Sequence, residues 1–340
     1  MTSIRMKGVL NWTKAHWPQI RKLATACFIV LVLVLLGFAA TRIEWTEVLG
    51  AIDRLPARTL WIAGLITVAS YAVYGSFDLL GKYYTGHDLV WWRAMLVGFI
   101  SYAFTMNFGA PVGGVGLRLR LYTRQGLRQG VVMRVMALSL ATNWIGYLLL
   151  AGMLFAAGGM TLPEGWALGN GALRLIGAAM VLAGLAYLYL CGFSSTRSWT
   201  LRGHEIELPT LGLAVIQISI AMLNWVLIAA VIYVLMQQKV AYPMVLATLL
   251  ISAIAGAMAH IPGGLGVIES VFIALLTSES MPRFEILGAI LVYRAMYYLG
   301  PLFVAGTCYL AAEAKIDSQP NSSGSQEGES DIRCTNYPYR

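Results

Sequence analysis

The chain has 340 residues, of which 58% are hydrophobic and only 12% are charged, and its formal net charge is +8. Soluble domains carry about twice that charged fraction, so the composition predicts an all-α polytopic membrane protein and excludes a water-soluble enzyme. In such a protein the basic residues report orientation and contact with anionic lipid, so the positive charge does not indicate nucleic-acid binding.

The N-terminal part of the chain is basic and precedes the first apolar run. Residues 1–22 contain five Lys or Arg residues, which predicts a cytoplasmic N-terminus under the positive-inside rule. The apolar run at 23–40 is longer than the core of a signal peptide, so we expect it to be retained as a first transmembrane helix.

Runs of about 20 apolar residues are long enough to cross a bilayer. We assign each loop to one side of the membrane from its content of Lys and Arg. This assignment predicts six full spans and two further apolar stretches. Hydropathy alone would count these segments as eight helices. The six predicted spans are residues 23–40, 60–80, 131–157, 172–192, 209–236 and 286–312.

The first of the two further stretches, residues 91–117, precedes the densest basic segment after the N-terminus, residues 118–128. A full crossing would place that segment outside, against the positive-inside rule. A re-entrant hairpin that enters from the cytoplasm and turns at Pro111 removes the conflict. Residues 244–276 then form a second hairpin, which enters from outside and turns at Pro262. The alternative is eight ordinary helices with glycine-rich kinks.

Both predicted hairpins contain a proline followed by glycines. Pro111-x-Gly-Gly-x-Gly116 and Pro262-Gly-Gly-x-Gly266 are two versions of one pattern, and such a combination breaks a helix. Broken backbone at bilayer depth is tolerated only where protein or a water-filled cavity satisfies its polar groups. Two oppositely oriented, broken hairpins are typical of transporters built from inverted repeats.

Two arginines follow the first break directly. Glycines let the backbone approach a ligand closely, and the guanidinium groups of Arg118 and Arg120 match phosphate oxygens. These features suit the head group of a phospholipid. The alternative is that both arginines belong to a positive-inside loop that touches the lipid surface.

A carboxylate follows the second break. Glu269 within a membrane costs about 3 kcal/mol on insertion scales, so it should be paired, protonated or facing water. Arg294 in the last span is its predicted partner, and the structural alternative is a pair that only fastens the second hairpin to the last helix. Asp78, near the cytoplasmic end of the second span, is expected to pair with Lys82 one turn later.

The predicted substrate-binding residues are polar or glycine residues around the two breaks, of which Asn107 and His260 flank the breaks themselves. The cysteines and histidines lack ligand spacing, and no complete nucleotide-binding loop is present, so we predict no catalytic residue, metal or cofactor. The predicted substrate-binding residues are Asn107, Gly113, Gly114, Arg118, Arg120, His260, Gly263, Gly264, Glu269 and Arg294.

Three motifs, at residues 107–120, 261–269 and 293–301, resemble the membrane domain of the lysylphosphatidylglycerol synthetase/flippase family. The resemblance extends over residues 23–312. It implies transport or flipping of anionic phospholipid, of the cardiolipin or phosphatidylglycerol class, across the bacterial inner membrane. Two-part members carry a soluble aminoacyl-transferase domain after the membrane part. Here a short polar tail follows, so the chain is similar to the stand-alone members and we expect no enzymatic activity.

The sequence predicts three parts: a basic cytoplasmic N-terminus at 1–22, a transmembrane domain at 23–312, for which the resemblance implies lipid transport, and a disordered, polar cytoplasmic tail at 313–340. The spacings Gly109-x-x-x-Gly113 and Gly126-x-x-x-Gly130 permit close helix packing and with it a homo-oligomer.

In the leading hypothesis Arg118 and Arg120 hold the lipid phosphate from the cytoplasmic side. Glu269 and Arg294 form a switchable pair whose opening lets the charged head group pass. An alternative is a non-transporting membrane partner that presents lipid to a separate lipid- or glycan-modifying enzyme. A third hypothesis is a solute/proton symporter that uses Glu269, and the scarcity of buried acids argues against it.

Overall fold

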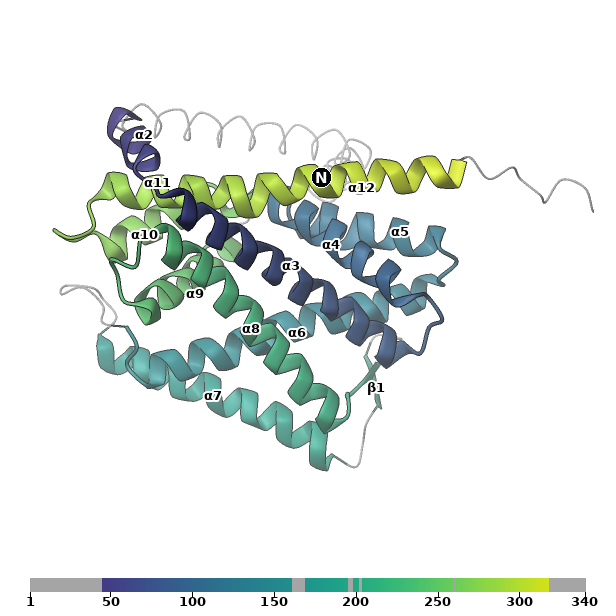
Figure 1. The fold of residues 1–340 in the computed structure, drawn as a ribbon. Helices are drawn as coiled ribbons and strands as arrows, with labels where there is room; N and C mark the ends of the chain where they lie inside the picture. Colours follow the sequence, from purple (N-terminus) through teal and green to yellow (C-terminus); the bar gives the residue numbers. More distant parts are fainter. Residues whose placement is uncertain (1–44, 161–168, 195–197, 202–203, 260, 318–340) are drawn as a thin grey trace, which may run out of the picture. The chain divides into compact units, whose positions relative to one another are not determined.

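The computed structural model describes residues 45–160, 169–194, 198–201, 204–259 and 261–317 (Figure 1). The predicted first span at 23–40 and the basic N-terminus therefore lie outside the described residues. The last helix ends at Asp317, so it continues into the first residues of the predicted tail.

Six helices among the described residues are long and apolar enough to cross a membrane, which confirms the predicted all-α polytopic fold. Five of them correspond to predicted full spans, and the sixth, α9, is the first arm of the predicted second hairpin. The re-entrant topology and the count of eight stay predictions. The six helices are α3 (Ala57–Thr85), α6 (Gln129–Ala156), α7 (Asn170–Phe193), α8 (Leu211–Leu235), α9 (Tyr242–Ala259) and the helix Arg283–Ala311.

The two strands were not predicted. Strands β1 (Ser198–Leu201) and β2 (His204–Glu207) pair antiparallel, between the predicted spans at 172–192 and 209–236.

The chain divides into two compact units, which are described separately. Unit 1 comprises Met1–Ile66, Ala151–Val181 and Val226–Tyr293. Unit 2 comprises Thr67–Leu150, Leu182–Trp225 and Arg294–Arg340.

The first glycine-rich break lies in unit 2. Helix α4 (Trp91–Phe108) ends at Gly109, whose φ of 86° is favourable for glycine. An eight-residue π-helix, η1 (Ala110–Leu117), and then α5 (Arg118–Arg124) follow. The turn is therefore at Gly109, and the prediction of a turn at Pro111 is wrong by two residues. Proline is tolerated in the first turn of the next helix because its missing N–H would be unpaired there.

The η1 segment packs back onto α4. A Cβ at Gly113 would come within 2.1 Å of the backbone nitrogen of Thr105, so the two backbones are in direct contact. This close approach requires glycine at position 113. It lets α4 and η1 lie against each other as the two arms of a helical hairpin.

The second break lies in unit 1, between α9 and α10 (Val267–Leu276). A short 3₁₀ turn, η2 (Pro262–Gly264), joins them, and the glycines at 263, 264 and 266 all have positive φ. Helix α10 packs against α9, as Figure 1 shows. Glycine is thus needed here for backbone conformation, whereas Gly113 is needed for space.

The last long helix consists of α11 (Arg283–Arg294), a π-helical segment η3 (Ala295–Leu299) and α12 (Gly300–Asp317). In unit 2, α12 packs against α4. In unit 1, the short helix α2 (Trp45–Asp53) packs against α11, where a Cβ at Gly288 would lie 3.4 Å from the carbonyl oxygen of Val48.

Candidate functional site

A fully buried carboxylate forms the centre of a polar cluster in unit 2. Asp78 of α3 is 0% exposed, and Arg118 Nη2 lies 3.1 Å from its Oδ1. The hydroxyl of Tyr122 donates to Asp78 Oδ2 at 2.9 Å, and the hydroxyl of Ser139 donates to Oδ1 at 3.1 Å. We call these four residues the Asp78 cluster.

The turn at Gly109 brings two of these donors to Asp78. Because η1 returns along α4, α5 begins beside the helices that precede the break. Arg118 and Tyr122 are four residues apart and so lie on one face of α5. Gly98 of α4 leaves room for the carboxylate, since a Cβ there would lie 3.3 Å from Asp78 Cγ.

The energetics of this cluster are those of a buried ion pair. Removing one partner of such a pair costs about 3–5 kcal/mol because a buried charge is left uncompensated. The pairing is incomplete, since Arg118 Nε is buried and has no hydrogen-bond partner among the described residues. A charged group kept at this cost within a membrane segment is a functional-site candidate.

The prediction that Asp78 pairs with Lys82 is wrong. Lys82 Nζ donates instead to the carbonyl oxygen of His87 at 2.8 Å, beyond the end of α3. Asp78 is buried, and the charge that compensates it comes from Arg118, 40 residues later. Asp78 was therefore not predicted as a site residue, although an acid in one span and an arginine beside a break were the available signal.

Arg120, the second predicted phosphate ligand, points elsewhere in unit 2. Its Cζ lies 5.9 Å from the centre of the Tyr309 ring on α12, at cation–π distance. Arg118 and Arg120 therefore contact different groups, and their predicted roles in substrate binding stay predictions.

Asn107 and Arg294 meet at Tyr298, a residue that the sequence analysis missed. Asn107 Nδ2 donates to the backbone carbonyl oxygen of Tyr298 at 3.1 Å and to that of Ala103 at 2.9 Å. Arg294 Cζ lies 5.2 Å from the centre of the Tyr298 ring. The end of α4 is thereby tied to the π-helical segment η3. π-helical segments are rare and are frequent at functional sites, and both η1 and η3 lie in motifs that carry the family resemblance.

A buried hydrogen-bond network surrounds Tyr297 in the same unit. The Tyr297 hydroxyl lies 2.7 Å from Ser70 Oγ and 3.2 Å from the Tyr102 hydroxyl. Ser70 Oγ donates to Asn224 Oδ1 at 2.9 Å, and Tyr71 donates to the Tyr297 carbonyl oxygen at 2.8 Å. A polar group that is buried in apolar surroundings needs hydrogen-bond partners, and this network supplies them.

The other predicted residues, apart from Gly114, lie in unit 1 or outside the described part. Gly263 and Gly264 form the turn between α9 and α10, and Glu269 is half-buried in the first turn of α10. His260 lies outside the described residues. Glu269 and Arg294 belong to different units, so their pairing stays a prediction. Gly114 of unit 2 is less crowded than Gly113, since a Cβ there would lie 3.4 Å from Thr105 Oγ1.

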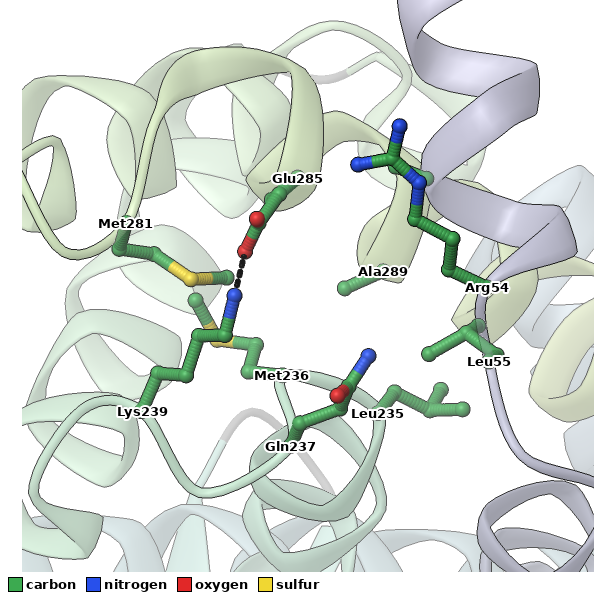
Figure 2. Close-up of a pocket in the computed structure, with 10 residues that line it drawn as sticks. Arg54, Leu55, Leu235, Met236, Gln237, Lys239, Met281, Glu285 and Ala289 are labelled. Atoms are coloured by element: carbon green, nitrogen blue, oxygen red, sulfur yellow. Dashed lines mark hydrogen bonds and ion pairs between the residues drawn. The ribbon is translucent and has the colours of Figure 1, made fainter.

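Unit 1 contains a pocket of about 190 Å³. Figure 2 shows the ion pair of Lys239 and Glu285 on one side of it, at 2.5 Å, and Arg54 and Gln237 across from the pair. The lining comes from residues around 51–55, 235–239 and 281–289.

No group of three or more potential metal ligands occurs in the described part of the chain.

Comparison with known proteins identifies the family. The profile described as "Lysylphosphatidylglycerol synthase TM region" matches residues 24–305. The inner membrane protein YbhN of Escherichia coli (strain K12) is 41% identical over 305 residues, which cover 89% of this chain and 96% of that protein. Protein slr0712 of Synechocystis sp. is 27% identical over 293 residues, which cover 84% of this chain and 90% of that protein. Phosphatidylglycerol lysyltransferase of Staphylococcus haemolyticus is 33% identical over 85 residues, which cover 24% of this chain and 10% of that protein.

The match to the profile spans most of the chain, and the similarity to YbhN spans nearly its whole length. Together with the six apolar helices, these matches describe a multi-pass inner-membrane protein. The chain belongs to the lysylphosphatidylglycerol synthase transmembrane-region family.

Proposed function

We propose that this protein moves anionic phospholipid, of the phosphatidylglycerol or cardiolipin class, between the leaflets of the inner membrane, and that it does so without enzymatic activity. Family membership supports a lipid-related role. The partial relative from Staphylococcus haemolyticus is named for an activity on phosphatidylglycerol, which supports an anionic glycerophospholipid as substrate.

The buried pair of Asp78 and Arg118 is the observation that carries the proposal. Arg118 follows the glycine-rich break directly, and its guanidinium binds Asp78 through Nη2 while Nε has no partner among the described residues. A guanidinium group with a spare N–H can donate to a second anionic oxygen, and its planar fork matches the oxygens of a phosphate group.

The proposed step is an exchange of anions on Arg118. A lipid phosphate that reaches the break competes with Asp78 for the guanidinium group. When Asp78 is displaced, the hydroxyls of Tyr122 and Ser139 still donate to it, which reduces the cost of leaving the carboxylate buried. The pair is thus a switch with two states, closed on Asp78 and open on phosphate.

The remaining predicted residues fit this scheme as later contacts. Arg120 provides a second positive charge near Arg118, and Asn107 and Arg294 hold the η3 segment through Tyr298. Glu269 belongs to unit 1 and Arg294 to unit 2, and their pairing stays a prediction. Both termini lie in the cytoplasm in this scheme, so the break after α4 opens toward that side.

The test is leaflet exchange in proteoliposomes that contain the purified full-length protein. Labelled phosphatidylglycerol and cardiolipin are compared with a zwitterionic control lipid. We expect Asp78→Asn and Arg118→Gln to slow exchange of the anionic lipids by about tenfold or more, because each removes a charge-assisted contact. The matched controls Glu279→Gln and Arg58→Gln change exposed residues outside the cluster and should exchange lipid at the wild-type rate.

Folded protein that shows no exchange above empty liposomes would reject the transport proposal. The result would favour the alternative, a membrane partner that presents lipid to a separate enzyme, and a co-purifying lipid- or glycan-modifying enzyme would support that alternative directly.

A further inference from the structure

A second cavity in unit 2, of about 400 Å³, lies beside the arginine-rich segment. Its polar lining residues are His87, Asp88, Gln125 and Arg128, and two leucines, a valine and a glycine complete it. Two buried polar atoms, His87 Nε2 and Gln125 Oε1, have no hydrogen-bond partner among the described residues. Both belong to residues of this one cavity, which points to a ligand that supplies both missing partners.

His87 supplies a donor to the cavity. Its Nδ1 accepts a hydrogen bond from the backbone N–H of Leu89 at 3.3 Å, so in the neutral ring the proton is on Nε2. Burial and the nearby charge of Lys82 hold the pKa of His87 below its usual value, which keeps the ring neutral at neutral pH. Nε2 therefore needs an acceptor.

Gln125 supplies an acceptor to the cavity. Its Nε2 donates to the backbone carbonyl oxygen of Leu121 at 3.2 Å, which fixes the orientation of the amide. Oε1 therefore needs a donor. A hydroxyl group satisfies both atoms, since it accepts from His87 and donates to Gln125.

We propose that this cavity binds the head group of a glycerol phosphate, with a glycerol hydroxyl between His87 and Gln125 and the phosphate beside Arg128. Arg128 is exposed at the cavity and can bind phosphate without breaking a buried pair. Asp88, also exposed, accepts a hydrogen bond from the second free hydroxyl of the glycerol. An ammonium head group carries donors but no acceptor, so it leaves His87 Nε2 unsatisfied.

This head-group site connects directly to the Asp78 cluster. The ring of His87 packs edge-on against Tyr122, with ring centres 6.1 Å apart, and the Tyr122 hydroxyl donates to Asp78. A role for this site in recognising the head group before transport rests on the proposed function. Its binding preference can nevertheless be measured even if the protein does not transport lipid.

The test is equilibrium binding by calorimetry to the full-length protein in phosphatidylcholine nanodiscs. The probes are short-chain phosphatidylglycerol, phosphatidic acid, phosphatidylethanolamine and free sn-glycerol 3-phosphate. We expect phosphatidylglycerol to bind about tenfold more tightly than phosphatidic acid, which has the phosphate but lacks the head-group glycerol.

Two variants remove the two cavity atoms separately. Gln125→Met removes the acceptor at similar volume, and His87→Phe removes the donor while keeping a ring against Tyr122. Each should reduce binding of phosphatidylglycerol to the level of phosphatidic acid. Gln129→Met is the matched control, since Gln129 is exposed and does not line the cavity. Thermal unfolding of each variant shows whether it is folded.

Equal binding of phosphatidylglycerol and phosphatidic acid by the wild type would overturn the proposal, because the site would then recognise charge alone. A preference that persists in both folded variants would overturn it too. If free sn-glycerol 3-phosphate binds as tightly as the lipid and depends on Gln125, the glycerol-phosphate site stands and its source is the soluble compound.

Leaflet exchange separates this inference from the proposed function. Selective binding without exchange keeps the head-group site and rejects transport, whereas exchange without a binding preference keeps transport and rejects the site.

Discussion

Gly98 of α4 lies against the carboxylate of Asp78 on α3, so that a Cβ at position 98 would stand 3.3 Å from Asp78 Cγ and from Oδ2. The absence of a side chain at this point lets the acid sit between helices while Arg118, Tyr122 and Ser139 donate to it. The position of the buried charge thus depends on a residue that carries no charge itself.

We predict that Gly98→Ala destabilises the protein by about 1–3 kcal/mol, because the carboxylate must move a few tenths of an ångström from three donors. Gly212→Ala is the control, since a Cβ there meets nothing within 4 Å and alanine is the better helix former. The unfolding midpoint should fall for Gly98→Ala, whereas it should rise or stay unchanged for Gly212→Ala. Equal shifts would show that the contact with Asp78 carries no cost.

The ion pair of Asp78 and Arg118 should behave non-additively. Asp78→Asn and Arg118→Met each leave one buried charge unpaired, which should cost about 3–5 kcal/mol in the free energy of unfolding. The double variant leaves neither charge and should cost clearly less than the sum of the two. A double-mutant cycle on unfolding in detergent measures the difference. Strictly additive losses would mean that the two side chains do not interact.

Tyr297→Phe should destabilise unit 2. The change removes a hydroxyl that lies 2.7 Å from Ser70 Oγ and 3.2 Å from the Tyr102 hydroxyl, and the expected cost is about 1–3 kcal/mol. Ser101→Ala is the matched control, because its buried hydroxyl has no partner among the described residues. The drop in the thermal unfolding midpoint should therefore be larger for Tyr297→Phe than for Ser101→Ala. An equally large drop for Ser101→Ala would contradict the network.

The sequence predicted those features of the fold that depend on local composition. Hydropathy located the long helices because crossing a bilayer requires a run of about 20 apolar residues, and the glycine-rich motifs marked both breaks. Within the first break the details differ, since glycine at 109 forms the turn and Pro111 begins the next helix.

Side-chain partners could not be predicted in the same way. Lys82, the closest basic residue on the same helix, was the obvious partner for Asp78, but the actual partner reaches it only because η1 returns along α4. The contacts of Tyr297 and Tyr298 likewise depend on the rotation of packed helices about their axes, which neither hydropathy nor charge counting determines. The family resemblance pointed to the correct segments but not to these contacts.

His87 should make the stability of the protein depend on pH. The groups that surround it are Lys82, Asp78, Asp88 and Arg128, together with the ring of Tyr122. Burial, the largest cause, and Lys82 hold its pKa in the folded protein below the usual value, which is about 6.5 in an unfolded chain.

The sign of the effect follows from proton binding. As the pH falls through about 6.5, the unfolded chain takes up a proton at this site before the folded protein does, so stability is lost on the acid side and is fully present above that pH. The unfolding midpoint should therefore fall more steeply below about pH 6.5 in the wild type than in His87→Gln. An NMR titration of labelled histidine, assigned by the same variant, gives the pKa directly. A value at or above about 6.5 for His87 would contradict the buried, neutral ring on which the head-group site depends.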